Sequence, residues 1–196
     1  KNMNTVIFDV GNVLVGYDWE SYLRSFHYSE EIYQRIADAV FLNEDWLEGD
    51  IGRISTEEWR NLFIENAPDL ESQIREVFAG FEGTIVPWSI TEGWIAYFRS
   101  LGYKLYYLSN YSQELYQRSK DKLKFLDTFD GGIFSYQVKC IKPDERIYRL
   151  LLTRYSICPK DAVFYDDRPE NVEAAVRLGI KGIVFHPDIP LQMMGK

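Results

Sequence analysis

The sequence is poor in cysteine and histidine, with two of each among its 196 residues. Cys140 and Cys158 show no spacing typical of a disulfide framework, and a chain of this length can bury a core without covalent cross-links. We therefore expect two buried thiols and a reducing compartment. His27 and His186 have no spacing typical of metal ligands, so we expect them to have surface or structural roles.

Long apolar runs and an excess of positive charge are also absent. The first apolar run, Val6 to Phe8, is interrupted by Asp9, so we expect no secretory signal, no membrane-spanning segment and a cytoplasmic location. Lys and Arg total 22 against 30 Asp and Glu, which gives a formal net charge of −8. Because a field of this sign repels nucleic acids and acidic membranes, we expect neither as a partner.

What the sequence does contain is a regular alternation of strand and helix patterns. Five short runs of β-branched or aromatic residues, each followed by turn signals, predict buried strands. They are Thr5 to Asp9, Lys104 to Ser109, Gly132 to Ser135, Ala162 to Asp166 and Gly182 to Phe185. Amphipathic patterns predict helices at Glu92 to Leu101, Gln113 to Leu123, Asp144 to Tyr155 and Glu170 to Leu178. This alternation predicts an α/β fold, a parallel sheet with helices on both faces.

The segment from 15 to 86 carries helical periodicity and no convincing strand. Ser55 with Glu58 forms a capping-box pattern there, which marks the start of a helix. We predict a sheet domain made of residues 1–14 and 87–196 and a helical cap domain at residues 15–86. The insert follows the first strand directly, at the edge of the sheet where ligands of open α/β folds bind, so it is placed to act as a lid.

Four short motifs with reactive side chains follow predicted strands or precede a predicted helix. They are Phe8-Asp9-Val10-Gly11-Asn12-Val13, Leu108-Ser109-Asn110, Ile141-Lys142-Pro143-Asp144 and Phe164-Tyr165-Asp166-Asp167-Arg168. Each motif alone has an ordinary explanation as a turn, a cap or a helix entry. Together they lie at the elements that would build one crevice.

In their order and residue types these motifs resemble the four motifs of the haloacid dehalogenase superfamily, and the resemblance covers the whole chain, including the helical cap. It implies a Rossmann-like sheet in which the predicted strands, numbered along the chain, lie in the order five, four, one, two, three. The run Phe-Asp-x-Gly-Asn-Val is also similar to a bacterial subgroup that includes phosphatases acting on hexose phosphates such as glucose 1-phosphate.

The resemblance implies a role for each motif. Asp9 attacks phosphorus and forms an aspartyl-phosphate, while Lys142 neutralises the phosphoryl oxygens and holds Asp9. Ser109 and Asn110, with nearby backbone amides, bind the phosphate group. Mg²⁺ prefers oxygen ligands, so Asp9, Asp167 and the Gly11 carbonyl suffice to hold it. Asp166 either shares the ligand role or orients a water. We therefore expect a Mg²⁺-dependent phosphatase whose substrate is a small phosphorylated metabolite.

Gly11 is a departure from the pattern, because most phosphatases of the superfamily carry there an aspartate that serves as general acid and base. Asp18 either replaces this acid or caps the helix that begins at Trp19. Dehalogenases of the superfamily also lack the acid, since a halide leaves without a proton. A metal-free dehalogenase and a weakened member that only binds a ligand or a protein therefore stay open. The neighbouring Asp166 and Asp167 favour the phosphatase, because such carboxylates repel a nucleophilic aspartate unless a cation is bound.

The insert is rich in aromatic residues, including Trp19, Trp46, Trp59 and Tyr17. At helical spacing such residues are typical of a hydrophobic core. The alternative is that some of them stack on the ring of a sugar.

Overall fold

The computed structural model describes residues 3–196 and contains a five-stranded parallel sheet in the order β5-β4-β1-β6-β7. The strands are β1 Thr5–Phe8, β4 Lys104–Ser109, β5 Gly131–Phe134, β6 Ala162–Asp166 and β7 Lys181–Val184. This arrangement confirms both the α/β fold and the predicted strand order. Strand β1, which leads to Asp9, is the central strand.

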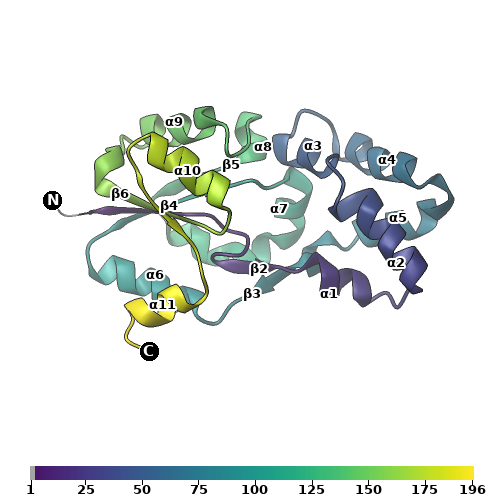
Figure 1. The fold of residues 1–196 in the computed structure, drawn as a ribbon, viewed down its shortest axis with the longest axis horizontal. Helices are drawn as coiled ribbons and strands as arrows, with labels where there is room; N and C mark the ends of the chain where they lie inside the picture. Colours follow the sequence, from purple (N-terminus) through teal and green to yellow (C-terminus); the bar gives the residue numbers. More distant parts are fainter. Residues whose placement is uncertain (1–2) are drawn as a thin grey trace.

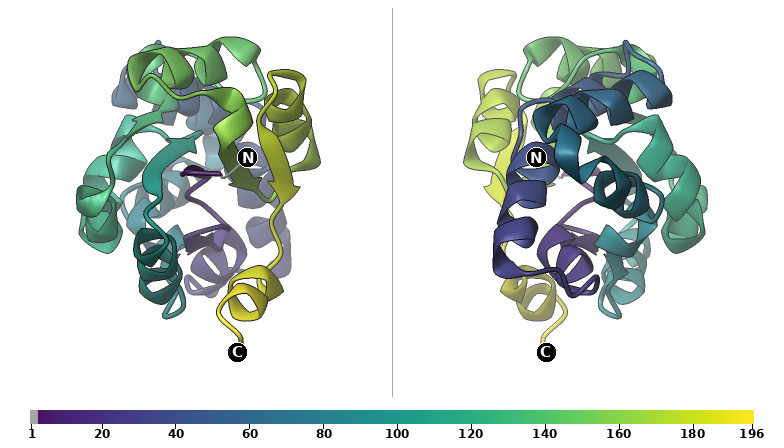
Figure 2. Two further views of the ribbon diagram at one scale, coloured as in Figure 1. Left: turned by 90° about the vertical axis from the view of Figure 1, so that its left-hand side faces the viewer. Right: turned by 90° about the vertical axis from the view of Figure 1, so that its right-hand side faces the viewer.

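Helices cover both faces of the sheet, and β1 is buried along its whole length because its successive side chains point to opposite faces and pack on both layers. Phe8 packs edge-on against Trp94 with ring centroids 4.9 Å apart, whereas Ile7 belongs to a second core cluster that contains Ile147. Figures 1 and 2 show α6 and α11 on one face and α9 and α10 on the other. The helices of this part are α6 Thr91–Ser100, α7 Gln113–Ser119, η4 Lys120–Thr128, α8 Ser135–Val138, α9 Glu145–Arg154, η5 Pro159–Asp161, α10 Pro169–Arg177 and α11 Asp188–Met193.

A second group of helices lies beyond the carboxyl ends of the strands, at the right of Figure 1. They are α1 Trp19–Arg24, α2 Glu30–Ile36, η1 Ala37–Phe41, α3 Trp46–Ile51, α4 Thr56–Asn66, η2 Pro68–Leu70, α5 Glu71–Phe78 and η3 Phe81–Thr84. The capping box of Ser55 and Glu58 begins α4, as predicted. Aromatic side chains hold the group together: Trp59 contacts Phe63, Phe78 and Phe81 with ring centroids 5.2 to 5.8 Å apart.

Two short strands connect this helical group to the sheet. Strand β2 Val15–Tyr17 pairs antiparallel with β3 Ile85–Pro87. The expectation that the segment from 15 to 86 contains no strand is therefore wrong. Three residues are too few to show a period of two, and the two partners are far apart in the sequence, so no local pattern revealed the pairing. The division into domains at 14/15 and 86/87 stays a prediction, and β3 crosses the second boundary.

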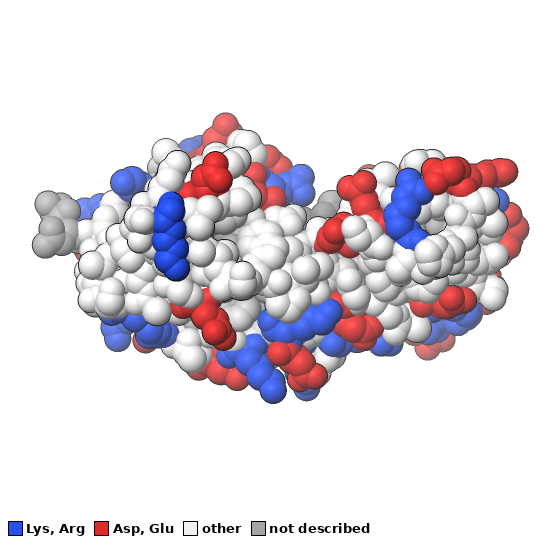
Figure 3. Space-filling model, turned by 90° about the horizontal axis from the view of Figure 1, so that it is seen from below, with Lys and Arg blue, Asp and Glu red and all other residues white. Residues whose placement is uncertain are grey.

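The face of the molecule seen from below in Figure 3 carries both signs of charge. On the face shown in Figure 3, acidic and basic side chains are interspersed, and neither sign forms an extended patch among the residues described there. Within residues 3–196 no helix has the length and apolar character that crossing a membrane requires. Cys140 is buried but Cys158 is exposed, so the expected burial of the cysteines is correct for the first alone.

Candidate active site

Asp9 lies directly after the central strand and is 8% exposed. Its backbone N–H donates to the Tyr165 carbonyl at 2.9 Å, which extends the ladder between β1 and β6 by one residue. One carboxylate oxygen, Oδ1, accepts a hydrogen bond from the Val10 N–H at 2.8 Å. The sheet and the following turn therefore hold the carboxylate at the end of β1.

The turn after Asp9 depends on Asn12, which has a positive φ of 62°. Asn tolerates this left-handed conformation better than most residues because its short side chain can hydrogen-bond locally. The Asn12 side-chain oxygen accepts from the Tyr17 N–H at 2.9 Å, and the Asn12 N–H donates to the Val15 carbonyl at 2.6 Å. As a result, Gly11, Asn12 and Tyr17 all line one cavity.

The space around Gly11 would admit a larger residue. A Cβ atom at this position would meet the Tyr17 Cβ at 3.8 Å, which is ordinary van der Waals contact, and its φ lies outside the positive region. The absence of an acid here is therefore not imposed by the backbone.

Lys142 uses all three of its ammonium hydrogens on described groups. Its Nζ lies 2.7 Å from Asp166 Oδ2, 2.8 Å from the Leu108 carbonyl and 3.1 Å from Asp9 Oδ1. Burial by itself lowers the pKa of Lys142, but the charges of Asp9 and Asp166 outweigh burial and the pKa is raised. The lysine thus remains a cation and contacts the Asp9 carboxylate.

Asp166 is fully buried at the end of β6, and both of its oxygens accept hydrogen bonds from the protein. Oδ1 accepts from the Arg168 N–H at 2.9 Å, and Oδ2 accepts from Lys142. The Asn171 side-chain amide lies 3.1 and 3.2 Å from the two oxygens. These contacts suit a residue that orients Lys142.

Three carboxylates gather at this point: one oxygen each from Asp9, Asp166 and Asp167 lie within 4.8 Å of one another. Burial raises the pKa of Asp9 well above its ordinary value of 3.8; the Lys142 ammonium opposes the shift, and the charges of Asp166 and Asp167 add to it. Burial, followed by the charge of Asp166, also raises the pKa of Asp167. Three acids against one ammonium leave excess negative charge, and oxygen ligands of this kind fit a divalent cation such as Mg²⁺.

Ser109 and Asn110 end β4 and also line the cavity. The Asn110 side chain makes a reciprocal pair with the Lys142 backbone: its Nδ2 donates to the Lys142 carbonyl at 3.0 Å, and its Oδ1 accepts from the Lys142 N–H at 2.8 Å. Asn110 therefore positions the lysine through its side chain. Because both polar atoms of this side chain are occupied, the predicted contact of Asn110 with phosphate would use its backbone N–H.

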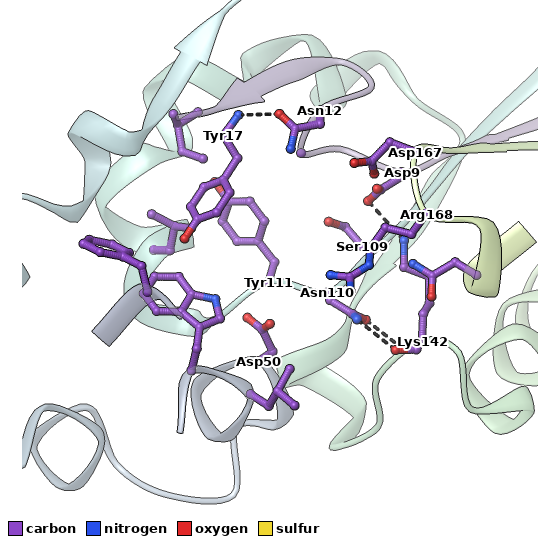
Figure 4. A pocket seen from close by; sticks show the side chains of 17 residues that line it. Asp9, Asn12, Tyr17, Asp50, Ser109, Asn110, Tyr111, Lys142, Asp167 and Arg168 are labelled. Carbon is purple, nitrogen blue, oxygen red and sulfur yellow. Dashed lines mark hydrogen bonds and ion pairs between the residues drawn. The ribbon is translucent and has the colours of Figure 1, made fainter. Parts of the chain in front are cut away.

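The predicted site residues thus line a single cavity of about 250 Å³, except for Asp166, which lies behind Lys142. Figure 4 shows Asp9, Asp167, Ser109 and Lys142 on one side of this cavity. Asp18 lies elsewhere, because its carboxylate accepts from the Ser21 N–H at 3.0 Å and caps α1. Of the two readings of Asp18, the structure confirms the helix cap.

The other side of the cavity comes from the inserted helices, and sequence reasoning missed its one carboxylate among the described residues, Asp50. This residue lies on α3 beside Trp46 and is 6% exposed, and Figure 4 shows its carboxylate pointing into the cavity. Burial raises the pKa of Asp50 to about 7, although Lys142 opposes the shift. A signal was available, because the spacing of four residues places Asp50 on the same helix face as the aromatic Trp46. What the sequence lacked was any indication that this face turns toward Asp9.

Comparison with known families gives one match that covers most of the chain. The family model described as haloacid dehalogenase-like hydrolase matches residues 3–179.

Curated proteins match with lower coverage. The chain is 29% identical over 145 residues to flavin mononucleotide hydrolase 1 of Arabidopsis thaliana, an alignment that covers 71% of this chain and 56% of that protein. It is 41% identical over 66 residues to a phosphorylated carbohydrates phosphatase of Thermotoga maritima, covering 32% of this chain and 31% of that one. The chain therefore spans about half of the first relative and about a third of the second.

Among solved structures, a similar fold is found in a HAD family enzyme of Bacteroides thetaiotaomicron in complex with magnesium and inorganic phosphate. The TM-score is 0.77 at 24% identity, and the alignment covers 94% of this chain and 95% of that one. At this identity the likeness concerns the fold.

Proposed function

Because the chain belongs to the haloacid dehalogenase-like hydrolases, we propose that it is a Mg²⁺-dependent phosphatase that hydrolyses phosphate esters of small molecules through Asp9. One observation carries the proposal: Asp9, Asp166 and Asp167 bring their oxygens within 4.8 Å of one another at a buried site with Lys142 as its paired ammonium. When all three carboxylates are ionised, such a cluster needs further positive charge to offset their mutual repulsion, and a divalent cation supplies it.

The proposed ligands of Mg²⁺ are the carboxylates of Asp9 and Asp167 and the backbone carbonyl of Gly11. Asp166 is the weaker candidate, because its oxygens already accept hydrogen bonds from Lys142, Arg168 and Asn171. When bound, Mg²⁺ supplies positive charge that offsets the repulsion between the phosphate dianion and the attacking carboxylate.

Asp9 then acts as the nucleophile. Its carboxylate attacks phosphorus, the bond between phosphorus and the ester oxygen breaks, and the departing alkoxide takes a proton from water, which leaves an aspartyl-phosphate on Asp9. Lys142 holds Asp9 in place from Oδ1 and keeps positive charge beside the developing negative oxygens. The Ser109 hydroxyl and the amide of Asn110 bind the phosphoryl group. Water hydrolyses the aspartyl-phosphate, which releases inorganic phosphate and restores the carboxylate.

We propose a sugar phosphate as the narrower substrate class. The similarity to the carbohydrates phosphatase supports it. Tyr17 and Trp46 also line the cavity, and aromatic faces of this kind stack on sugar rings.

The test is phosphate release from an aryl phosphate with Mg²⁺ and with EDTA, in the wild type and in Asp9→Asn. We expect release that needs Mg²⁺ and falls at least about a thousand-fold in the variant. A matched control is Asp127→Asn, which makes the same change at an exposed position and keeps activity. Halide release from a 2-haloacid in EDTA, without phosphate release from any ester, would support the dehalogenase instead.

A further inference from the structure

Asp50 is a buried acid on the inserted helix α3 for which the reaction above has no use. Its side chain lies in the cavity wall with Tyr17 and Trp46, and the residue is 6% exposed. No residue among 3–196 donates a hydrogen bond to the carboxylate, and Lys142 contributes only a longer-range charge interaction. The Asp50 oxygens are not among the buried side-chain atoms left unpaired, so they are open to the cavity and can accept a hydrogen bond from a molecule that enters it.

The backbone around Asp50 is fixed to the sheet domain, which makes its orientation a built feature. The Ser135 hydroxyl donates to the Asp50 carbonyl at 2.5 Å, and the Lys139 ammonium donates to the Gly52 carbonyl at 2.7 Å. Gly52 ends α3 with a φ of +77°, and a Cβ there would lie 2.9 Å from the Tyr136 carbonyl oxygen. These contacts use the main chain of the α3 end and leave the Asp50 side chain directed into the cavity.

The groups that face Asp50 are two tyrosines and, farther away, Lys142. Burial raises the pKa of Tyr17 well above its ordinary value of 10.0, and the charge of Asp50 raises it further. Burial is also the main cause that raises the pKa of Tyr111, with Asp50 adding to it. Both hydroxyls therefore stay protonated around a carboxylate whose own pKa is raised by burial to about 7. This end of the cavity is polar but has no cation in contact with the acid among the described residues.

The two ends of the cavity are thus chemically different. Figure 4 shows Asp9, Asp167 and Lys142 at one end and Asp50 with the aromatic residues at the other. The whole cavity has a volume of about 250 Å³. When a phosphoryl group is held at Asp9, the rest of this volume is left for the alcohol part of the ester.

We propose that Asp50 recognises the leaving group, by accepting a hydrogen bond from a hydroxyl or ammonium group on the alcohol part of the phosphate ester. This inference rests on the proposed phosphatase function. It makes Asp50 a specificity residue, because an ester without such a donor leaves the buried carboxylate unpaired.

The first test compares esters that differ in this donor. Phenyl phosphate has none, glycerol phosphate and hexose phosphates offer hydroxyls, and phosphoethanolamine offers an ammonium. In Asp50→Asn, we expect the ratio of kcat/KM for the best donor-bearing ester to that for phenyl phosphate to fall by about 10- to 100-fold. The ester whose kcat/KM falls most relative to phenyl phosphate identifies the donor group that Asp50 recognises. Glu48→Gln makes the same change on the partly exposed side of α3 and keeps the ratio of the wild type.

The second test reads binding without turnover. The same esters are titrated into the single variant Asp9→Asn and into the double variant that also carries Asp50→Asn. We expect the second substitution to weaken the binding of the donor-bearing ester about tenfold or more relative to that of phenyl phosphate. A binding difference without turnover in the wild type rejects the phosphatase and keeps the subsite. Turnover with equal losses for all esters, or no binding difference, overturns the role of Asp50.

Discussion

The Lys142 ammonium lies 2.7 Å from the Asp166 carboxylate, and this pair is fully buried behind the carboxylate of Asp9. The ammonium reaches Asp9 at 3.1 Å on its other side. Asp166 therefore orients the lysine, and the lysine in turn orients the nucleophile. The Asn110 side chain fixes the same lysine by hydrogen bonds to the Lys142 backbone, so Asp166 and Asn110 together help to determine where Asp9 is held.

Replacing Lys142 by Met removes the ammonium that pairs with Asp9 and Asp166. Because breaking a buried ion pair leaves an uncompensated charge, we expect the free energy of unfolding in EDTA to fall by about 3–5 kcal/mol. Urea denaturation measures this change. The control Lys104→Met removes a lysine from an exposed pair with an N–O distance of 3.9 Å and should cost less than about 1 kcal/mol. Equal losses for the two variants would contradict the network.

Mg²⁺ should stabilise the folded chain, because it neutralises the carboxylates of the native site. At a free concentration of 100 times its Kd, the expected gain in unfolding free energy is about 2.7 kcal/mol. Replacing Asp167 by Asn removes one proposed ligand, and the gain should then largely disappear. Thermal unfolding with and without Mg²⁺ measures both. A gain that is the same in the wild type and in the variant would move the metal site away from Asp167.

Gly11→Asp should restore a general acid. A Cβ at this position meets only ordinary contact with Tyr17, so the turn tolerates the change. We expect kcat for esters of ordinary alcohols to rise by up to about a hundred-fold, because these leaving groups need a proton. Aryl esters should gain less, since their leaving groups need little protonation. Steady-state rates for an alkyl and an aryl phosphate test this, and an unchanged ratio of the two rates, with no gain for the alkyl ester, would contradict the restored acid.

Asp50 makes stability depend on pH. Its pKa is about 7 in the folded state against an ordinary 3.8, so between these values the folded chain holds a proton that the unfolded chain has lost. Stability therefore falls as pH rises through this window, by up to about 4 kcal/mol, and levels off above it.

The variant Asp50→Asn lacks this dependence. Its unfolding free energy relative to the wild type should increase from about pH 4 to about pH 8, as measured by urea denaturation in EDTA. Asp9 and Asp167 titrate in both proteins, so their contributions cancel in the difference. A difference that does not change with pH would show that Asp50 ionises at an ordinary pKa.

Much of the fold was readable from local patterns. The strand runs and the capping box of Ser55 and Glu58 depend on nearest neighbours along the chain, and the structure confirms them. The carboxyl ends of parallel strands meet at one edge, so Asp9, Ser109 and Asp167 were predictable as neighbours.

What the sequence did not reveal depends on contacts between distant segments. The pairing of β2 with β3 joins two runs of three residues each, and neither run is long enough to show a pattern. The position of Asp50 depends on the contacts that Ser135 and Lys139 make with the end of α3. No spacing in the sequence encodes which face of α3 those contacts turn toward Asp9.

The central claim is that the Asp9 carboxylate attacks phosphorus, and the phosphorylation state of that residue tests it most directly. The enzyme is mixed with Mg²⁺ and a phosphate ester, quenched in acid during turnover, and its peptides are analysed by mass spectrometry. We predict one phosphoryl group on the peptide that contains Asp9, and none in Asp9→Asn. Phosphate release by the wild type with the phosphoryl group on another residue, or on no residue, would contradict the account.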